Sequence, residues 1–221
     1  AVSEANSFFG FGDTVADFVT DNVARLWSQD NFGEDLLINV RDANVYYWQA
    51  SLGLNNRAVA LSSRSGASDA PTISRQVVVS DIDRHVIALG CNPLGSSLQD
   101  LLLVRWSDQE NSVDWTPTAT NTSGSLRLSS GSEIVAAVET RQQILIWTDV
   151  SLYSMRYVGP PFTFSITLLA SNTSIIAPNA VVAIGDRVYW MDTENFFMYG
   201  GQIQEIPCTV LRYVFDDINL D

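Results

Sequence analysis

One histidine stands close to two aspartates, and this is the first combination in the sequence that could do chemistry. His85 is the only histidine of the chain, and Asp81 and Asp83 precede it by four and two residues. Imidazole and carboxylate groups bind metals, and a catalytic triad would also have to use His85. The sequence contains no Gly-x-Ser-x-Gly nucleophile elbow. A charged hairpin tip explains these residues more simply, so we predict no metal ligands and no catalytic residues here.

Neighbouring carboxylates are the second combination of interest. They occur at residues 34–35, at Asp108 with Glu110, and at residues 216–217. A glycosidase needs two carboxyl groups held at a defined separation in a cleft. Acidic side chains in turns are the more ordinary case, because they accept backbone hydrogen bonds there. We therefore predict that the protein is not an enzyme and that it has no cofactor-binding residues.

A tryptophan followed two residues later by an aspartate occurs three times, each time after an apolar run. The three copies are Trp106 with Asp108, Trp147 with Asp149, and Trp190 with Asp192. They are 41 and 43 residues apart. A repeat of about 40–45 residues, built from short strands, is typical of one β-propeller blade. The ring would fill the gap between neighbouring sheets, and the carboxylate would accept backbone hydrogen bonds in its hairpin turn.

The rest of the pattern predicts an all-β protein. Short apolar runs alternate with polar turns from residue 35 onward, and no convincing helix follows residue 34. Gly185-Asp186 between two apolar runs predicts a two-residue hairpin loop. We predict a β-propeller-like array of antiparallel blades over residues 35–221, incomplete in this chain.

Residues 1–34 have a different composition and form a predicted non-propeller segment, which we consider a possible subunit contact. Within it, residues 13–27 fit a short amphipathic helix and a strand-and-turn segment equally well. The chain starts without a methionine or a basic leader and ends as abruptly. We therefore expect it to be part of a longer polypeptide.

Composition limits the partners. The 221 residues include 25 acids and 12 bases, which gives a net charge of −13 and argues against a surface that grips nucleic-acid phosphates. A surface that repels phosphates would instead let DNA slide past it. Cys91 and Cys208 have no metal-site spacing, so we expect two buried thiols, with a disulfide as the alternative. No apolar run approaches the ~20 residues of a membrane span.

Several phrases resemble virion proteins of short-tailed bacteriophages, in particular their packaged-DNA stabilisation or tail nozzle proteins. These phrases lie in order at residues 104–110, 114–117, 153–162, 188–191 and 196–208. The resemblance covers about residues 100–221. It implies a β-propeller virion protein that sits in the phage tail as a ring below the portal, where it helps retain and then conduct the genome.

From this resemblance, the repeat and the acidity we expect a structural homo-oligomer, a hexamer, in the phage tail. Its partners would be other head–tail proteins, namely the portal or adaptor and a fibre or needle. DNA would be non-specific cargo in the channel, and no membrane would be involved.

The stretch of residues 153–164 has two interpretations. Its Gly-Pro-Pro sequence cannot lie in a central strand. It could be an exposed subunit contact or a crossover between blades, and the contact would comprise Tyr157, Gly159, Pro160, Pro161 and Phe162.

Two other functions remain open. The 6 Trp, 7 Tyr and 10 Phe residues could line a sugar-binding face, as in a host-receptor or carbohydrate-binding propeller at the tail tip. A propeller glycoside hydrolase is the third hypothesis.

Overall fold

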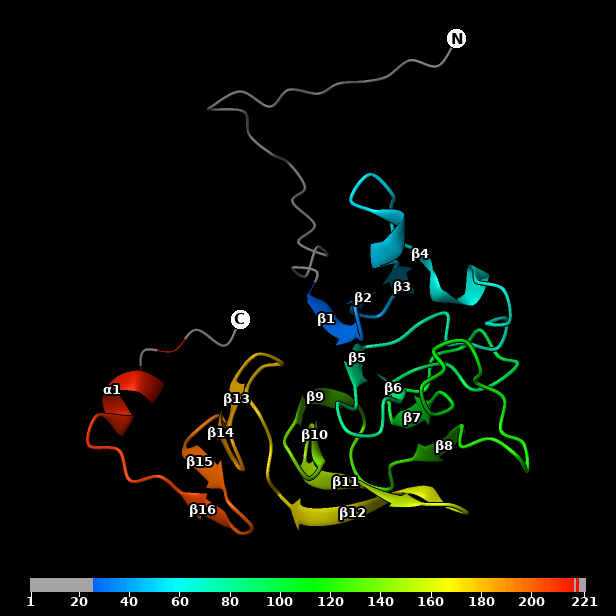
Figure 1. Cartoon of the computed structure of the whole chain (residues 1–221). Coiled ribbons are helices and arrows are strands. Elements are labelled where there is room, and N and C mark those ends of the chain that lie inside the picture. The colour runs from blue at the N-terminus through cyan, green and yellow to red at the C-terminus, as the bar shows by residue number, and fades with distance from the viewer. Residues whose placement is uncertain (1–25, 217, 219–221) are drawn as a thin grey trace, which may run out of the picture.

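The computed structural model describes residues 26–216 and 218, and these residues form an all-β structure. Their sixteen strands are grouped in four antiparallel sheets, each made of four consecutive strands. We call these sheets blades 1 to 4. Figure 1 shows the blades arranged around a common centre, with the first strand of each blade nearest to it. The predicted propeller-like array of antiparallel blades is confirmed.

The first two blades take up residues 27–127. Blade 1 consists of β1 (Trp27–Phe32), β2 (Asp35–Val40), β3 (Val45–Trp48) and β4 (Val59–Ala60). Blade 2 consists of β5 (Gln76–Val79), β6 (Val86–Leu89), β7 (Leu103–Trp106) and β8 (Gly124–Arg127). Two short 3₁₀ helices, η1 (Ala50–Leu52) and η2 (Leu61–Ser63), flank β4.

The last two blades follow with shorter connections. Blade 3 consists of β9 (Ile134–Glu139), β10 (Ile144–Thr148), β11 (Ser151–Gly159) and β12 (Thr163–Ser171). Blade 4 consists of β13 (Val181–Ile184), β14 (Arg187–Met191), β15 (Phe196–Tyr199) and β16 (Ile203–Glu205). A short helix, α1 (Leu211–Phe215), comes after blade 4. In the described part of the chain, no helix has the length and apolarity required to cross a membrane.

Apolar side chains fill the gaps between consecutive blades. Leu37 and Tyr47 of blade 1 share one buried cluster with Val79 and Ala88 of blade 2. A second cluster joins blades 2 and 3, and a third joins blades 3 and 4. All four side chains of β6 are buried, because both faces of blade 2 are covered by a neighbouring blade. Face-to-face packing of sheets is thus the main source of cohesion.

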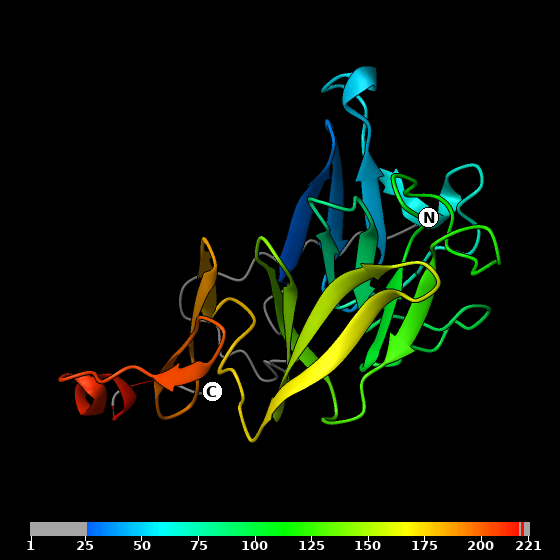
Figure 2. The ribbon, with the colours of Figure 1, turned by 60° about the horizontal axis from the view of Figure 1, so that its bottom comes forward.

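The four blades form an open arc. The first strands contact one another in order, β1 with β5, β5 with β9, and β9 with β13. In the described residues no strand of blade 4 pairs with a strand of blade 1, and Figures 1 and 2 show the two as the ends of the arc. Each terminal blade therefore has one face without a neighbouring blade.

The tryptophan spacing does not mark the blade repeat. Successive blades begin 49, 58 and 47 residues apart, at residues 27, 76, 134 and 181. Trp147 and Trp190 lie on the second strands β10 and β14, but Trp106 lies on the third strand β7. Long loops on both sides of β7 lengthen blade 2, so the 41-residue step joins different strands. The expectation that the three residues are equivalent is wrong for Trp106.

Local predictions had mixed outcomes. The Gly185-Asp186 loop is confirmed, since β13 and β14 pair from Ile184 and Arg187 outward. β1 lies within the segment that we placed outside the blades. The helix α1 was not predicted. The alternatives for residues 13–27 fall almost entirely on residues 1–25, outside the described residues.

The indole ring of Trp106 leaves no space for a side chain at Gly124 in blade 2. Gly124 pairs with Trp106 across β7 and β8, and a Cβ atom built on Gly124 would lie 2.5 Å from Cζ2 of the indole ring. We expect Gly124→Ala to lower the free energy of unfolding by about 2–3 kcal/mol, because the buried ring has no room to move. Urea denaturation measures this change. Gly200→Ala is the control, since its Cβ would meet only a side-chain carbon at 3.7 Å. Equal stability of both variants would contradict the clash.

Candidate functional site

The three predicted tryptophans all fill gaps between blades. Trp147 and Trp190 face each other across blades 3 and 4, with ring centroids 5.4 Å apart in an edge-to-face arrangement. Trp106 meets Phe164 in the same way at 5.3 Å, between blades 2 and 3. Edge-to-face pairs of this kind add to the stability gained from burial alone. These residues hold the blades together, and Trp190 also lines a groove on blade 4.

Two of the three predicted aspartates, Asp108 and Asp149, bind distant loops. Asp149 accepts the N–H of Ser132 at 2.8 Å and its hydroxyl at 2.6 Å, which fixes the loop that enters β9. Asp108 binds the N–H and hydroxyl of Thr122 at 2.8 and 2.6 Å. Burial opposes ionisation of Asp108 and Asp149, but these hydrogen bonds outweigh it, so the pKa of each carboxyl is lowered.

Asp192 combines both kinds of contact. Its carboxylate accepts the N–H of Thr193 in its own turn at 2.7 Å and also the hydroxyl of Ser174 in the preceding loop. All three aspartates are thus hydrogen-bonded anchors of loop structure.

His85 is a buried residue of the interface between blades 2 and 3. Its Nε2 lies 3.1 Å from Oγ1 of Thr122, and its Nδ1 has no partner. Phe164 and Tyr157 pack against the imidazole, with ring centroids at 5.0 and 5.7 Å. Burial lowers the pKa of His85 to about 4. In the described residues no group of three potential ligands could hold a metal, and Asp81 is an exposed turn residue.

The remaining predicted acids do not form a pair in a cleft. Glu34 and Glu110 are exposed, and Asp35 accepts the Tyr47 hydroxyl and the N–H of Ala50. Asp216 is also exposed, and Asp217 lies outside the described residues.

Both cysteines are free thiols, Cys91 buried and Cys208 half-buried. Burial raises the pKa of the Cys91 thiol to about 12, so it is protonated at neutral pH.

The Gly-Pro-Pro stretch lies at the tip of the β11–β12 hairpin, inside blade 3, so it is not a crossover between blades. Figure 2 shows these two long strands reaching from blade 3 across to blade 2. The hydroxyl of Thr163 donates to the carbonyl of Thr122 at 2.9 Å and ties the hairpin to blade 2. Val158 and Phe162 at the tip are 54% and 77% exposed. The tip is therefore free to contact another molecule.

The centre of the arc holds a feature that the sequence analysis missed. The edge of each first strand that faces the centre has no neighbouring strand, and we call it the inner edge. On the inner edge of β5, the N–H of Val77 donates to the Ser28 hydroxyl at 3.1 Å. The N–H of Val79 donates to the Asp30 carboxylate at 2.7 Å. Side chains of blade 1 thus take the place of a missing strand.

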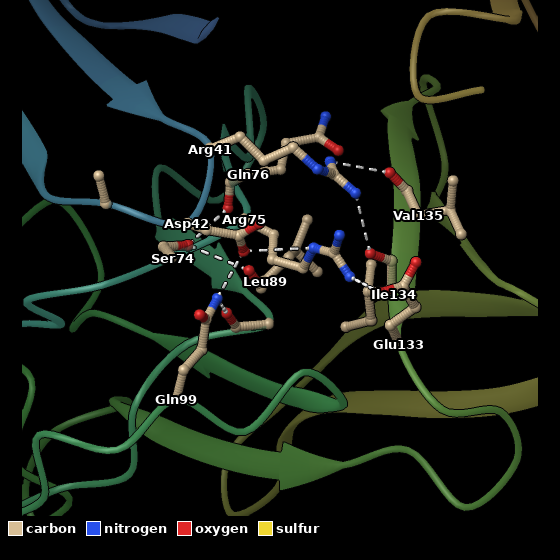
Figure 3. A network of polar contacts seen from close by, with 12 residues as sticks. Arg41, Asp42, Ser74, Arg75, Gln76, Leu89, Gln99, Glu133, Ile134 and Val135 are labelled. Atoms are coloured by element: carbon tan, nitrogen blue, oxygen red, sulfur yellow. Dashed lines mark hydrogen bonds and ion pairs between the residues drawn. The ribbon is translucent and has the colours of Figure 1, made fainter. Parts of the chain in front are cut away.

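The inner edge of β9 is bound in the same manner by side chains of blades 2 and 1. The amide group of Gln76 donates to the carbonyl of Ala137 and accepts its N–H, both at 2.8 Å. Arg41 reaches from blade 1 and donates to the carbonyls of Val135 and Ile134 at 3.1 and 3.5 Å (Figure 3). The sequence signal for these contacts was slight, because Gln76 is the one polar residue of β5 and because Ser28 and Asp30 lie in the mainly polar strand β1.

A buried arginine extends this network. Arg75 is 10% exposed and forms ion pairs with Glu133 of blade 3 and, at 3.4 Å, with Asp42 of blade 1 (Figure 3). Gln99 donates to Asp42 at 2.8 Å. Burial, followed by the charge of Arg75, lowers the pKa of Arg41. One end of the first strands is therefore held by two arginines that join three blades.

The opposite end of the first strands is acidic. We call Asp30, Asp81, Asp83 and Glu139 the acidic mouth; a cavity of about 190 Å³ lies beside the last two. Glu139 accepts the N–H of Asp81 at 2.8 Å. Burial, and then the charges of the other three carboxylates, raises the pKa of Glu139 to about 7. Burial also raises the pKa values of Asp30 and Asp83.

The outward faces of the terminal blades are largely apolar, although the exposed Gln29 and Asn31 lie on that of blade 1. On blade 4, Val182 and Ile184 are 52% and 64% exposed, and Tyr189 and Met191 lie on the same face. On blade 1, Trp27 is 64% exposed. Its outward neighbours are half-buried apolar residues, namely Leu36, Ile38, Tyr46 and Trp48. Sheets that are apolar on both faces are normally covered on both, so these faces indicate further contacts.

No protein-family model and no curated protein matches this sequence.

Gln76 tests the role of the inner edge. We expect Gln76→Ala to lower the free energy of unfolding by about 2–3 kcal/mol, because the N–H and C=O of Ala137 lose the side-chain amide that binds both of them. Chemical denaturation followed by tryptophan fluorescence measures the loss. Gln202→Ala, at an exposed position, should change stability by less than about 0.5 kcal/mol. A loss no larger than that of the control would rule out this role.

Glu139 tests the electrostatics of the acidic mouth. Its pKa is raised in the folded state from 4.5 to about 7, so its contribution to stability is complete below pH 4.5 and is lost as pH rises through 7. Glu139→Gln keeps an acceptor for Asp81 N–H but carries no charge. Allowing for solvent screening, we expect the variant to be more stable than the wild type by about 1–2 kcal/mol at pH 8, and equal to it at pH 4.

The measurement is urea denaturation at both pH values, with the exposed Glu194→Gln as the control. A variant that is less stable than the wild type at pH 8 would show that the charged form of Glu139 is the favourable one.

Proposed function

We propose that this chain is a structural component of a bacteriophage tail. In this proposal it belongs to a nozzle- or adaptor-type ring below the portal, which retains packaged DNA and forms part of the ejection conduit. The observation that carries the proposal is the open arc of blades whose two end faces are largely apolar and, among residues 26–216, are not covered by a further blade. The resemblance of residues 104–117 and 153–162 to tail nozzle proteins gives the class of assembly.

The side chains that could take part in a reaction are engaged in contacts within the fold, and this supports a scaffold rather than a catalyst. The aspartates at 108, 149 and 192 are engaged with loop N–H and hydroxyl groups, and His85 is buried among aromatic rings. A general acid or base must reach a substrate proton, and these groups are already occupied by the fold. Such a molecule would act by its shape, as a structural part of an assembly.

Assembly with other copies is supported by the exposed apolar surface. Val182 and Ile184 on blade 4, Trp27 on blade 1 and Phe162 on the β11–β12 tip are each more than half exposed. Exposed apolar patches mark protein contacts in soluble proteins. A homo-oligomeric ring, a hexamer in this proposal, would bury them against neighbouring subunits and head–tail proteins.

The acidic mouth supports a passive relation to DNA. Carboxylates at one end of the first strands repel phosphates, so DNA could pass without binding. In this proposal DNA is a non-specific cargo, and no base or phosphate contact is needed. Two of the four acids, Asp30 and Glu139, also hold backbone N–H groups, so the positions of these carboxyl groups are fixed by the fold.

A second candidate function is a host-receptor or carbohydrate-binding blade array at the tail tip. The cavity beside Asp83 and Glu139 favours it, because Tyr157 and Gln143 also line that space. An aromatic ring next to carboxylate and amide groups suits a sugar. A glycan array separates the two functions, since a conduit component should retain no glycan. A propeller glycoside hydrolase remains the third candidate.

The proposal is tested in phage particles. An epitope-tagged chain should be found by electron microscopy at the tail below the portal. Particles with Asp81→Lys and Glu110→Lys, two exposed acids that line one cavity near the mouth, should eject DNA several-fold more slowly, because the new cations bind phosphates. Glu194→Lys with Glu205→Lys, two exposed acids of blade 4, is the matched control. Absence of the chain from the tail would end the proposal.

A further inference from the structure

The tip of the β11–β12 hairpin presents one large apolar side chain. Phe162 is 77% exposed, and the neighbouring Val158 is 54% exposed. An exposed phenylalanine on a hairpin tip is costly unless a partner covers it, because burying it is worth about 1.5–3 kcal/mol. We call residues 158–162 the arm tip.

The hairpin is held in place, so the arm tip has a fixed position. Phe164 packs on Trp106 and His85 of blade 2, with ring centroids at 5.3 and 5.0 Å. The Thr163 hydroxyl donates to the carbonyl of Thr122. A contact group that is already fixed loses little conformational entropy when it binds. The arm tip is therefore pre-organised as a knob.

Blade 4 carries a hollow of matching character on its outward face. A groove of about 260 Å³ lies there, and its lining is mainly apolar; Val182, Tyr189, Met191, Phe196 and Ile206 contribute to it. Phe215 of α1 packs on Phe196, one of the residues that line the groove, with ring centroids 5.3 Å apart. We call this groove the blade 4 hollow. In the described residues nothing fills it, and its size suits one aromatic side chain.

The knob and the hollow lie on opposite sides of the chain. Figures 1 and 2 both show the β11–β12 hairpin pointing away from blade 4. A knob on one side and a hollow on the other cannot meet within one molecule, but they can meet between two. Repetition of such a head-to-tail contact closes a ring when the rotation between subunits allows it.

We propose that the arm tip of one copy of this chain inserts Phe162 into the blade 4 hollow of a second copy. This contact rests on the proposed ring and deepens it, because it names the two surfaces that join neighbouring subunits. The contact is heterologous, so each copy uses one knob and one hollow.

A complementation experiment with two charge variants tests the contact. Phe162→Asp removes the knob and Val182→Asp blocks the hollow; both positions are exposed, so both variants should keep the wild-type melting temperature. The wild type should sediment as a multiple of its 24.3 kDa monomer. Each variant alone should be a monomer, with self-association weakened about 100-fold. An equimolar mixture should give a one-to-one dimer, because one intact knob and one intact hollow remain.

The control is Leu98→Asp. Leu98 lies in a loop and is 78% exposed, almost the same as Phe162, and this variant should assemble as the wild type does. A monomeric wild type, an assembling Phe162→Asp variant or a monomeric mixture would each overturn the contact. Loss of assembly in Phe162→Asp with full assembly in Val182→Asp would also overturn it, since it indicates a tip-to-tip contact. The localisation of the chain in phage particles is a separate experiment from this one. The tail function can therefore be supported when the contact is refuted, and the contact can be supported when the tail function is refuted.

Discussion

The structure depends on how the unpaired inner edges of the first strands are satisfied. Any blade array places one edge of each first strand at the centre, where no further strand can pair with it. Here Ser28 and Asp30 bind the edge of β5, and Gln76 and Arg41 bind the edge of β9. Unsatisfied backbone groups would cost stability and invite strand addition by other chains. These side-chain contacts also fix the order and spacing of the blades, which the non-directional packing of apolar faces does not.

The same contacts explain why the two ends of the first strands carry opposite charges. Arg41 and Arg75 occupy one end of the first strands, and carboxylates such as Asp30 and Glu139 occupy the other. Most of these groups are committed to hydrogen bonds or ion pairs between blades. What remains available for function is surface: an acidic mouth, two apolar end faces and one projecting hairpin. Those features support an assembly component better than they support a catalyst.

The sequence was sufficient for the fold class, because alternating apolar runs and short polar turns indicate antiparallel sheets wherever they occur. It was insufficient for the blade boundaries. The Trp-x-Asp spacing suggested a repeat, but Trp106 occupies a different strand from Trp147, since loop lengths in blade 2 are not encoded by any periodicity. β1 was missed because Ser28 and Asp30 give it the polarity of a loop. Their function depends on β5, about 50 residues away, which no local pattern can show.

Hydrogen exchange at individual amides tests this account most directly. Amides on the open edge of a sheet normally exchange quickly, whereas those in the core exchange only through unfolding. If side chains of neighbouring blades replace a missing strand, the amides of Val77, Val79 and Ala137 should be as strongly protected as those of the central strand β10. Exchange at these three positions as fast as at the amides of the exposed loop residues Leu54 and Asn55 would show that the inner edges are open, and would contradict the account.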